Sequence, residues 1–420
     1  MQKRIIQVIN HPLISGSALL IVGTFMANIF NFLFNISMIG TLSASDYGVL
    51  ASLASLILIL ALAAESLVPS IVHFSGPFFA KKQYDILKGL FLKFTRISLL
   101  VGIVFFTAII FGSPFISSFF HIDNSTVVIL LAFAVLLNFT SVVNRAILQA
   151  ELTFTYLSGA LVVSSIIKFI AGVGLVFLGL GVVGAMLGFF FSYLFLYLST
   201  FFPLRHILIQ KTRNYNIGIS ELLRYGGSSS ATIIGLTFLI TTDILMVKHF
   251  FDPYQAGLYA VLSLIGRVIY FFCAPIGMVM FPLVVQKKTK GEKYNSIFLA
   301  SIFLVLASSF GITLFYFLFP EFVIKLFARS NEYLVLKPYI GLFGIFISLY
   351  CLLTIITNFF LSIKKTHIVW PIIIISLAQA ILIYLFHSTF FQIIYISLGS
   401  VIFLLTILLL YYLKLYGQRR

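Results

Sequence analysis

The sequence predicts an all-α polytopic membrane protein with about twelve membrane-spanning helices arranged as two six-helix lobes. The first observation is composition, because 61% of the 420 residues are hydrophobic and only 9% are charged, against about 25% charged residues in a soluble domain. The second is a series of apolar runs of the length that crosses a bilayer. The third is a helix–turn–helix pattern at Asn35–Leu53 that recurs at Thr241–Leu262. We therefore expect two halves, residues 1–210 and 211–420.

Each apolar run of about 20 residues or more is long enough to cross the hydrocarbon core. We expect such helices at about residues 13–39, 49–74, 97–119, 126–146, 155–178, 181–203, 226–249, 257–285, 296–318, 337–361, 368–387 and 389–413. The fifth and sixth are divided only by Gly179-Leu180-Gly181, and the last two meet at His387-Ser388. The first run is too long for the apolar region of a secretory signal, so we expect it to be retained.

The recurring pattern places a turn between two helices in each half. In the second half the turn is Phe251-Asp252-Pro253, where proline and aspartate stop a helix. Asp46-Tyr47-Gly48 in the first half aligns with Gln255-Ala256-Gly257 in the second. Because each half has an even number of helices, the two halves have the same orientation and are related by an axis along the membrane normal.

The distribution of lysine and arginine predicts the topology. With the N-terminus inside, the outer segments hold only Lys248, Lys325, Arg329 and Lys337, and the inner segments hold nearly all the other basic residues. This bias predicts a cytoplasmic membrane protein with both termini in the cytoplasm. The net charge of +16 is then explained by topology and not by nucleic-acid binding. The outer segment at about 319–336 is compatible with a short interfacial helix.

Four basic residues at or near membrane depth are candidates for binding an anionic substrate. Lys168 lies in the middle of a helix, where it either faces an aqueous cavity or pairs with an acid. Arg267 either binds phosphate through its guanidinium or forms an ion pair with Asp243. Arg145 and Arg224 lie near helix ends, from which they could also reach lipid headgroups.

Two acids within the predicted helices are candidates for cation coupling. Glu65 lies beyond the middle of the second helix, and Asp243 lies in the outer third of the seventh. A carboxylate at this depth can be protonated or can bind Na⁺ during transport. The alternative is a structural role in which these acids neutralise Lys168 or Arg267.

Other polar residues at membrane depth could line the same cavity. Asn28, Asn31 and Asn35 are spaced three and four residues apart and therefore share one face of the first helix. They either form a polar cavity wall or make hydrogen bonds between helices. Tyr259 and Tyr270 lie near the face of Arg267 and are further candidates for the cavity wall.

Three prolines are expected to bend helices two and eight, which occupy corresponding positions in the two halves. They are Pro69, Pro275 and Pro282, and bends in corresponding helices indicate moving parts. The sequence contains no catalytic constellation and no nucleotide-binding P-loop pattern, so we expect neither an enzyme nor a resident cofactor or metal. The only expected small ion is a coupling H⁺ or Na⁺.

The chain resembles the polysaccharide and O-antigen flippases of the multidrug/oligosaccharidyl-lipid/polysaccharide exporter superfamily. The resemblance depends on the run TDILMVKHFFDPYQAGLYAVLSLIGRVIYFF, on NISMIGTLSASDYGVLASLASL near the N-terminus, and on GLGVVGAMLG at Gly179 to Gly188. It implies a fold like that of the multidrug and toxic compound extrusion (MATE) transporters, with two lobes around a central cationic cavity and transport by alternating access.

The resemblance also implies a substrate and partners. The expected substrate is an undecaprenyl-pyrophosphate-linked oligosaccharide, and the expected partners are membrane lipids and glycan-assembly proteins. One alternative is a multidrug or small-solute antiporter of the same superfamily. Another is a scaffold without transport activity in a glycan-synthesis complex.

Overall fold

The structure, a computed structural model, describes residues 12–213, 219–289, 291–328 and 330–417. Within these ranges it does not describe the side chains of residues 12–21, 80, 219–226, 228, 229, 282, 286, 289, 416 and 417. The described ranges contain no β-strand. They contain 11 helical segments that are long and apolar enough to cross a membrane. The chain is therefore a multi-pass membrane protein, and the predicted all-α fold class is confirmed.

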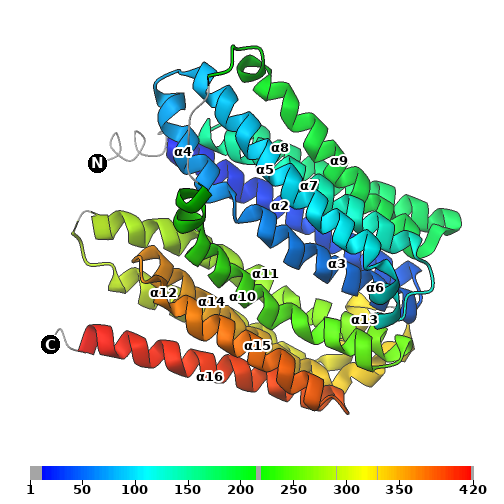
Figure 1. The fold of residues 1–420 in the computed structure, drawn as a ribbon. Helices are drawn as coiled ribbons and strands as arrows, with labels where there is room; N and C mark the ends of the chain where they lie inside the picture. Colours follow the sequence, from blue (N-terminus) through cyan, green and yellow to red (C-terminus); the bar gives the residue numbers. More distant parts are fainter. Residues whose placement is uncertain (1–11, 214–218, 290, 329, 418–420) are drawn as a thin grey trace. The chain divides into compact units, whose positions relative to one another are not determined.

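The chain forms two compact units, each a bundle of helices (Figure 1). Unit 1 comprises Met1–Leu42 and Leu56–Ser230, and unit 2 comprises Ser43–Ser55 and Ala231–Arg420. The predicted halves met at residue 210, whereas the units divide inside a helix at residue 230. Ser43–Ser55, which precedes most of unit 1 in the sequence, packs with unit 2.

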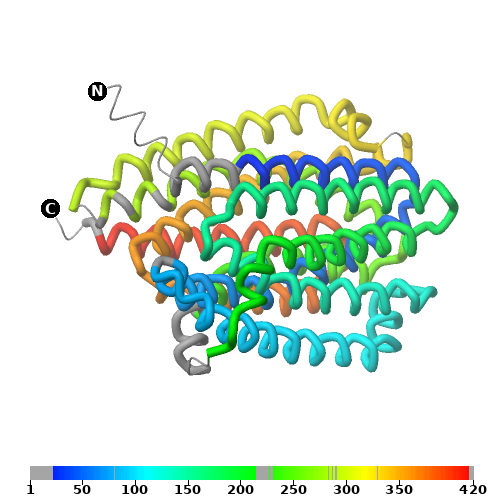
Figure 2. The backbone as a smooth tube through the Cα atoms, turned by 90° about the horizontal axis from the view of Figure 1, so that it is seen from above, coloured from blue at the N-terminus to red at the C-terminus, as the bar shows by residue number. Residues whose placement is uncertain are grey.

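Unit 1 is built around α7, which packs most extensively against α4, α5 and α9. Its helices are α2 (Pro12–Thr41), the second part of α3 (Ala44–Glu65), α4 (Val68–Ala80), α5 (Tyr84–Phe111), α6 (Ser113–Phe119), α7 (Thr126–Ala150), α8 (Phe154–Leu175) and α9 (Gly181–Leu208). Helix α7 packs against α4, α5 and α9, and α8 packs between α2 and α9 (Figure 2).

Unit 2 is built in the same way around α14. Its helices are the first part of α3, the part of α10 (Ile219–Phe250) that follows Ser230, α11 (Pro253–Thr289), α12 (Asn295–Leu318), α13 (Pro320–Phe327), α14 (Lys337–Ser362), α15 (Val369–Leu385) and α16 (Phe390–Gly417), with short turns η2 (Asn331–Leu336) and η3 (Thr366–Ile368). Helix α14 packs against α11, α12 and α16. It is the fourth long helix of its half, as α7 is of the other.

The predicted count of twelve helices holds when α8 and α9 are counted separately, because the fifth apolar segment runs continuously from Phe154 to Leu208. The turn between them, η1 (Val176–Leu180), has Gly179 at φ +89° and is followed by Gly181 at φ +49°. Residues with a side chain rarely adopt these conformations. The two glycines reverse the chain so that α9 returns alongside α8.

Two predicted helix starts were wrong. The third helix begins at Tyr84 and not at 97, and the seventh begins at Ile219 and not at 226. Both helices extend beyond the apolar core through segments with basic residues, among them Lys88 and Lys93 in the third helix. Hydropathy identifies only the part of a helix that lies in hydrocarbon, so these extensions were missed.

The predicted bend at Pro69 coincides with a break in the second membrane helix. Helix α3 ends at Glu65, and α4 begins at Val68 with Pro69 in its first turn. Proline suits this position because its missing N–H needs no partner there. Helix α11 is continuous through Pro275 and Pro282. The side chain of Pro282 lies outside the described residues, and bends at these two prolines stay predictions.

The repeated motif itself forms a close helix crossing in unit 2. A Cβ atom on Gly48 of α3 would lie 2.8 Å from the backbone nitrogen of Gly257 on α11, and a Cβ on Gly257 would overlap the carbonyl oxygen of Ala44. Tyr47, beside this crossing, is only 1% exposed. The two segments that align in sequence therefore pack against each other, backbone to backbone.

A short helix follows the third membrane helix in each half. Helix α6 follows α5, and α13 follows α12. Each has a proline in its first turn, where a helix tolerates it best. Each also exposes large aromatic side chains, Phe115 on α6 and Phe322 on α13. The predicted interfacial helix in 319–336 thus corresponds to α13, which has a counterpart in the other unit.

Glu321 holds two lysines at the start of α13. Its carboxylate lies 2.7 Å from Lys337 Nζ and 2.9 Å from Lys325 Nζ. These contacts bring a carboxylate to two of the basic residues that the predicted topology places outside.

Titration of Glu321 gives a first testable prediction. Hydrogen bonds from Lys337 and Lys325 lower the pKa of Glu321 to about 2, below its usual value of about 4.3. Because the folded pKa is the lower one, the stabilising contacts are complete above about pH 4.3 and are lost as the pH falls towards 2. The side-chain carboxyl signal of Glu321, followed by ¹³C NMR, should titrate well below pH 4. Lys337→Met should move its midpoint upwards, and an unchanged midpoint near 4.3 in both proteins would contradict the ion cluster.

Candidate functional site

Lys168 lies inside unit 1 between two phenylalanine rings. Its Nζ is 4.7 Å from the centroid of Phe34 on α2 and 4.5 Å from that of Phe189 on α9. The residue is 7% exposed. Phe34 can approach because α8 has Gly172 one turn further on, where a Cβ would lie 2.6 Å from the Phe34 ring. Lys168, Phe34 and Phe189 form what we call the Lys168 cage.

The Lys168 cage contains no carboxylate. Glu65, which was a possible partner, binds Arg145 instead, and Asp243 belongs to unit 2. Among the residues that the structure describes, no acid forms an ion pair with Lys168. An ammonium over two aromatic faces gains about 2 kcal/mol when desolvated, while a lysine at the centre of a membrane helix costs about 2.5–3.5 kcal/mol. The rings therefore offset only part of the cost of the charge.

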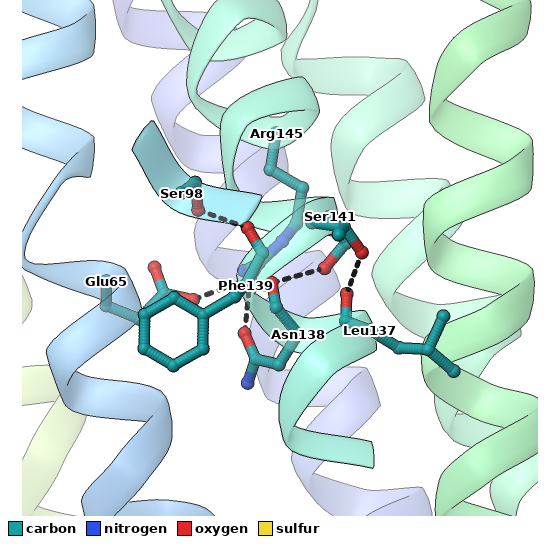
Figure 3. Close-up of polar contacts among 8 residues, drawn as sticks. Glu65, Ser98, Leu137, Asn138, Phe139, Ser141 and Arg145 are labelled. Carbon is teal, nitrogen blue, oxygen red and sulfur yellow. Dashed lines mark hydrogen bonds and ion pairs between the residues drawn. The ribbon is translucent and has the colours of Figure 1, made fainter. Parts of the chain in front are cut away.

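Arg145 and Glu65 form an ion pair at the break between α3 and α4 (Figure 3). Arg145 Nη2 lies 2.7 Å from Glu65 Oε1 and donates a second bond of 3.3 Å to Asn138 Oδ1. Asn138 lies two turns before Arg145 on α7, so both side chains share one face. Arg145 Nε is buried and makes no hydrogen bond. Glu65 is thus paired with Arg145, whereas the structural alternative predicted from the sequence paired it with Lys168 or Arg267.

The pair lies beside two further polar side chains that the sequence did not single out. Asn138 was missed although it is an amide within an apolar run. Tyr193 of α9 lies close to Arg145, Glu65 and Asn138. Tyrosine is common in this chain, so composition gave no signal for Tyr193; only its position across from α7 makes it part of the cluster.

Asp243 is buried in unit 2 and is satisfied by hydrogen bonds. Its Oδ2 accepts a 2.9 Å bond from the Tyr259 hydroxyl, and its Oδ1 accepts a 2.9 Å bond from the amide of Ile244. Asp243 and Tyr259 are both 0% exposed. Tyr259, a predicted cavity-wall residue, is thus fully buried, with its hydroxyl hydrogen-bonded inside the bundle.

Arg267 lies on the same side of α11 as Tyr259 and is half-buried. Its Nη2 donates a 2.9 Å bond to the carbonyl oxygen of Ile240. Asp243 and Tyr47 lie near enough to interact with it electrostatically. Within the described ranges, however, no ion pair joins Arg267 to Asp243. Arg267 and Asp243 thus belong to a looser polar cluster, in place of the direct ion pair that was the predicted alternative. Tyr47 also belongs to this cluster and was not predicted from the sequence.

The remaining predicted residues are placed as follows. Asn28, Asn31 and Asn35 are half-buried on α2, and the side chain of Asn35 donates to the backbone oxygen of Asn31 at 2.8 Å. Tyr270 is half-buried with its ring beside Tyr350. The side chain of Arg224 lies outside the described residues.

The asparagine face of α2 does not coincide with its apolar exposed face. Among the side chains of α2 that the structure describes, the large exposed apolar ones are Val22, Phe25, Met26, Ile29 and Leu33. At 100° per residue these positions lie on the opposite side of the helix from the three asparagines. The three half-buried asparagines therefore lie away from the apolar face that α2 exposes.

The predicted site residues fall into separate groups. The Lys168 cage and the Arg145–Glu65 pair belong to unit 1, and the Asp243–Tyr259–Arg267 cluster belongs to unit 2. In the described ranges no group of His, Cys, Asp and Glu side chains could hold a metal ion. What the groups offer is charge and hydrogen-bonding capacity at membrane depth.

The fold is similar to that of known transporters. An inward-facing multidrug resistance MATE family transporter of the MOP superfamily matches with a TM-score of 0.74 at 16% identity, over 94% of each chain. The lipid II flippase MurJ in an inward closed conformation matches with a TM-score of 0.69 at 16% identity, over 94% of this chain and 87% of MurJ. At these identities the likeness shows a shared fold, which confirms the expected MATE-like architecture.

Sequence comparison gives the family. No curated protein sequence matches the chain. A family profile described as polysaccharide biosynthesis protein matches residues 41–335, a range that includes the second copy of the repeated motif, most of the first, and the helices that carry Arg145, Lys168 and Arg267. The chain belongs to the polysaccharide biosynthesis protein family.

Proposed function

We propose that this protein is a flippase that moves a polyprenyl-pyrophosphate-linked oligosaccharide across the cytoplasmic membrane for surface polysaccharide assembly. In this proposal both termini are cytoplasmic, as the positive-inside bias predicts. A pyrophosphate–sugar headgroup cannot cross hydrocarbon unaided, because its charges would lose their hydration. A polar path through the protein removes that penalty, and the polyprenyl tail stays in lipid.

The observation that carries the proposal is the Lys168 cage. It holds a cation at membrane depth on aromatic faces, with no paired acid among the described residues. A phosphate that reached Lys168 would replace the weaker ring contacts with a charge-assisted hydrogen bond. Phe34 is on α2 and Lys168 is on α8, so a movement of α2 away from α8 would open the cage to a ligand.

Three other groups support an anionic, sugar-bearing substrate. Arg267 offers a half-buried guanidinium in unit 2. Arg145 is held by Glu65, which a phosphate could replace. The asparagines of α2 offer amides suited to sugar hydroxyls. Asp243 remains the candidate for H⁺ or Na⁺ coupling, while Glu65 is less suited because Arg145 already neutralises it. Glycan-assembly proteins are the expected partners.

Removing the charge of Lys168 tests the proposal. Lys168→Met keeps the length and apolar stem of the side chain but removes the ammonium. We expect at least a tenfold slower flipping of a fluorescent lipid-linked oligosaccharide in proteoliposomes, a change of about 1.4 kcal/mol in the barrier. Lys168→Arg should retain more activity than Lys168→Met, and Arg267→Ala should also reduce flipping.

The control is Lys414→Met, which removes a charge from an exposed lysine near the end of α16 and should leave flipping unchanged. Wild-type rates in both Lys168→Met and Arg267→Ala, at normal expression, would refute the role of these cations.

A second candidate function is multidrug export, because the MATE fold is shared and Asp243 provides a buried carboxylate for a cationic drug. Efflux of cationic dyes from cells that express the protein would favour this candidate. Flipping by the purified protein alone would exclude a purely scaffolding role.

A further inference from the structure

Helix α13 presents three distinct faces. Val323 and Ile324 are 2% and 0% exposed and pack into unit 2. Phe322 and Leu326, one turn apart, are 58% and 62% exposed. Glu321 and Lys325, also one turn apart, form the charged edge with Lys337. The helix is thus buried on one side, apolar and exposed on the second, and charged on the third.

The length of α12 fixes where α13 lies along the membrane normal. Helix α12 has 24 residues, or about 36 Å at about 1.5 Å per residue. The hydrocarbon core is about 30 Å thick, so α12 crosses it completely. Helix α13 begins two residues later, at Pro320, and α14 then carries the chain back. Helix α13 must therefore lie at the membrane surface where α12 ends.

The apolar face of α13 continues the exposed surface of α12. Large exposed side chains follow one another along the end of α12 and into α13, and they are Phe310, Leu314, Phe315, Phe317, Leu318, Phe319, Phe322 and Leu326. The residues on α12 lie within a segment that is long and apolar enough to span the membrane, so we expect their exposed side chains to meet lipid. Because the exposed apolar face of α13 continues that of α12 without interruption, we expect both faces to contact lipid.

We propose that α13 is an interfacial anchor whose Phe322 and Leu326 insert into the acyl region of one leaflet while the Lys325–Glu321–Lys337 cluster lies among the phospholipid headgroups. The cluster carries one excess positive charge, which favours the phosphate groups of lipid over bulk water. In the predicted topology this is the outer leaflet. The anchor fixes the height at which α12 and α14 enter the membrane, and it operates whatever the transported substrate is.

Tryptophan fluorescence tests the anchor in the reconstituted full-length protein. The chain has a single tryptophan, so Trp370→Phe gives a silent background. Into it we place Phe322→Trp on the apolar face and Lys325→Trp on the charged edge. A third variant, Phe310→Trp, reports from the exposed part of α12 inside the bilayer. Vesicles of phosphatidylcholine and phosphatidylglycerol carry bromine either near the headgroup or near the end of the acyl chain.

An interfacial helix lies about 5–10 Å into the boundary between headgroups and acyl chains. We therefore expect tryptophan at 322 to be quenched more strongly by the shallow bromines than by the deep ones. Tryptophan at 310 should show the reverse order, and tryptophan at 325 should be quenched mainly by aqueous iodide. Leu326→Trp provides a second probe of the apolar face if Phe322→Trp does not fold.

Two results would overturn the proposal. Quenching of the 322 and 326 probes by iodide, with no effect of brominated lipid, would place this face in water. Protection from both quenchers would show that protein covers it, either another part of the chain or a second copy. Neither result depends on transport, so the anchor can fail while the flippase proposal stands.

Discussion

Replacing Gly257 with alanine is expected to be among the most damaging single substitutions in unit 2. The new Cβ would overlap the carbonyl oxygen of Ala44, a backbone atom that cannot rotate away. Helix α11 would have to separate from the first turns of α3, and overpacking of this kind costs about 1–3 kcal/mol or more. Thermal unfolding of the purified protein in detergent should show a clearly lower midpoint.

Gly311→Ala is the matched control for Gly257→Ala. Gly311 is also helical, on α12, but a Cβ there meets nothing within 4 Å. Alanine should be neutral at this position or stabilising by up to about 1 kcal/mol, because it favours helix more than glycine does. Equal unfolding midpoints for the two variants would refute the close crossing.

The second glycine of the crossing gives a further check. Gly48→Ala alone should also destabilise, since its Cβ would lie 2.8 Å from the Gly257 nitrogen. The two substitutions act on one contact, so the double variant should lose less than the sum of the single losses. Additive losses would indicate that the two glycines have separate roles.

Much of the fold follows from hydropathy and turn chemistry. The division of the fifth and sixth helices at Gly179-Leu180-Gly181 was predicted, and the structure has positive φ at both glycines. A bend was predicted at Pro69, and a helix break lies there. The repeated motif could be recognised by aligning the two segments. The contact between Gly48 and Gly257 could not be predicted, because it depends on how α3 and α11 cross.

The pairing of the buried charges could not be predicted from the sequence. Two acids and four bases at or near membrane depth allow several pairings of equal chemical merit, and only the packing of helices selects one. Glu65 meets Arg145 because α4 packs against α7. Asp243 is satisfied by Tyr259, sixteen residues later, across the turn at Phe251-Asp252-Pro253. The aromatic partners of Lys168 were hidden among 48 phenylalanines.

Neutralising one member of the Arg145–Glu65 pair is the other substitution with a large expected effect. Glu65→Gln would leave Arg145 without its carboxylate, and Arg145→Gln would leave Glu65 without its guanidinium. An unpaired charge in a membrane helix costs about 2.5–3.5 kcal/mol, less here because the side chains are 15% and 40% exposed. Each single variant should therefore unfold at a lower denaturant concentration or temperature.

The double variant Glu65→Gln with Arg145→Gln separates a structural pair from a binding site. With no charge left unpaired, its stability should recover most of the single losses, giving a coupling energy of about 0.5–3 kcal/mol. Simple additivity in the cycle would show that the two side chains do not interact.

Flipping by this stable double variant then decides the role of Arg145. If Arg145 receives the substrate phosphate when Glu65 releases it, the double variant should fold normally and still lose transport, because its only guanidinium beside Asn138 is gone. If the ion pair serves only to join α3 to α7, transport should return together with stability. The stability of the double variant thus shows whether the Arg145–Glu65 ion pair stabilises the fold. Its transport activity shows whether Arg145 binds the substrate phosphate.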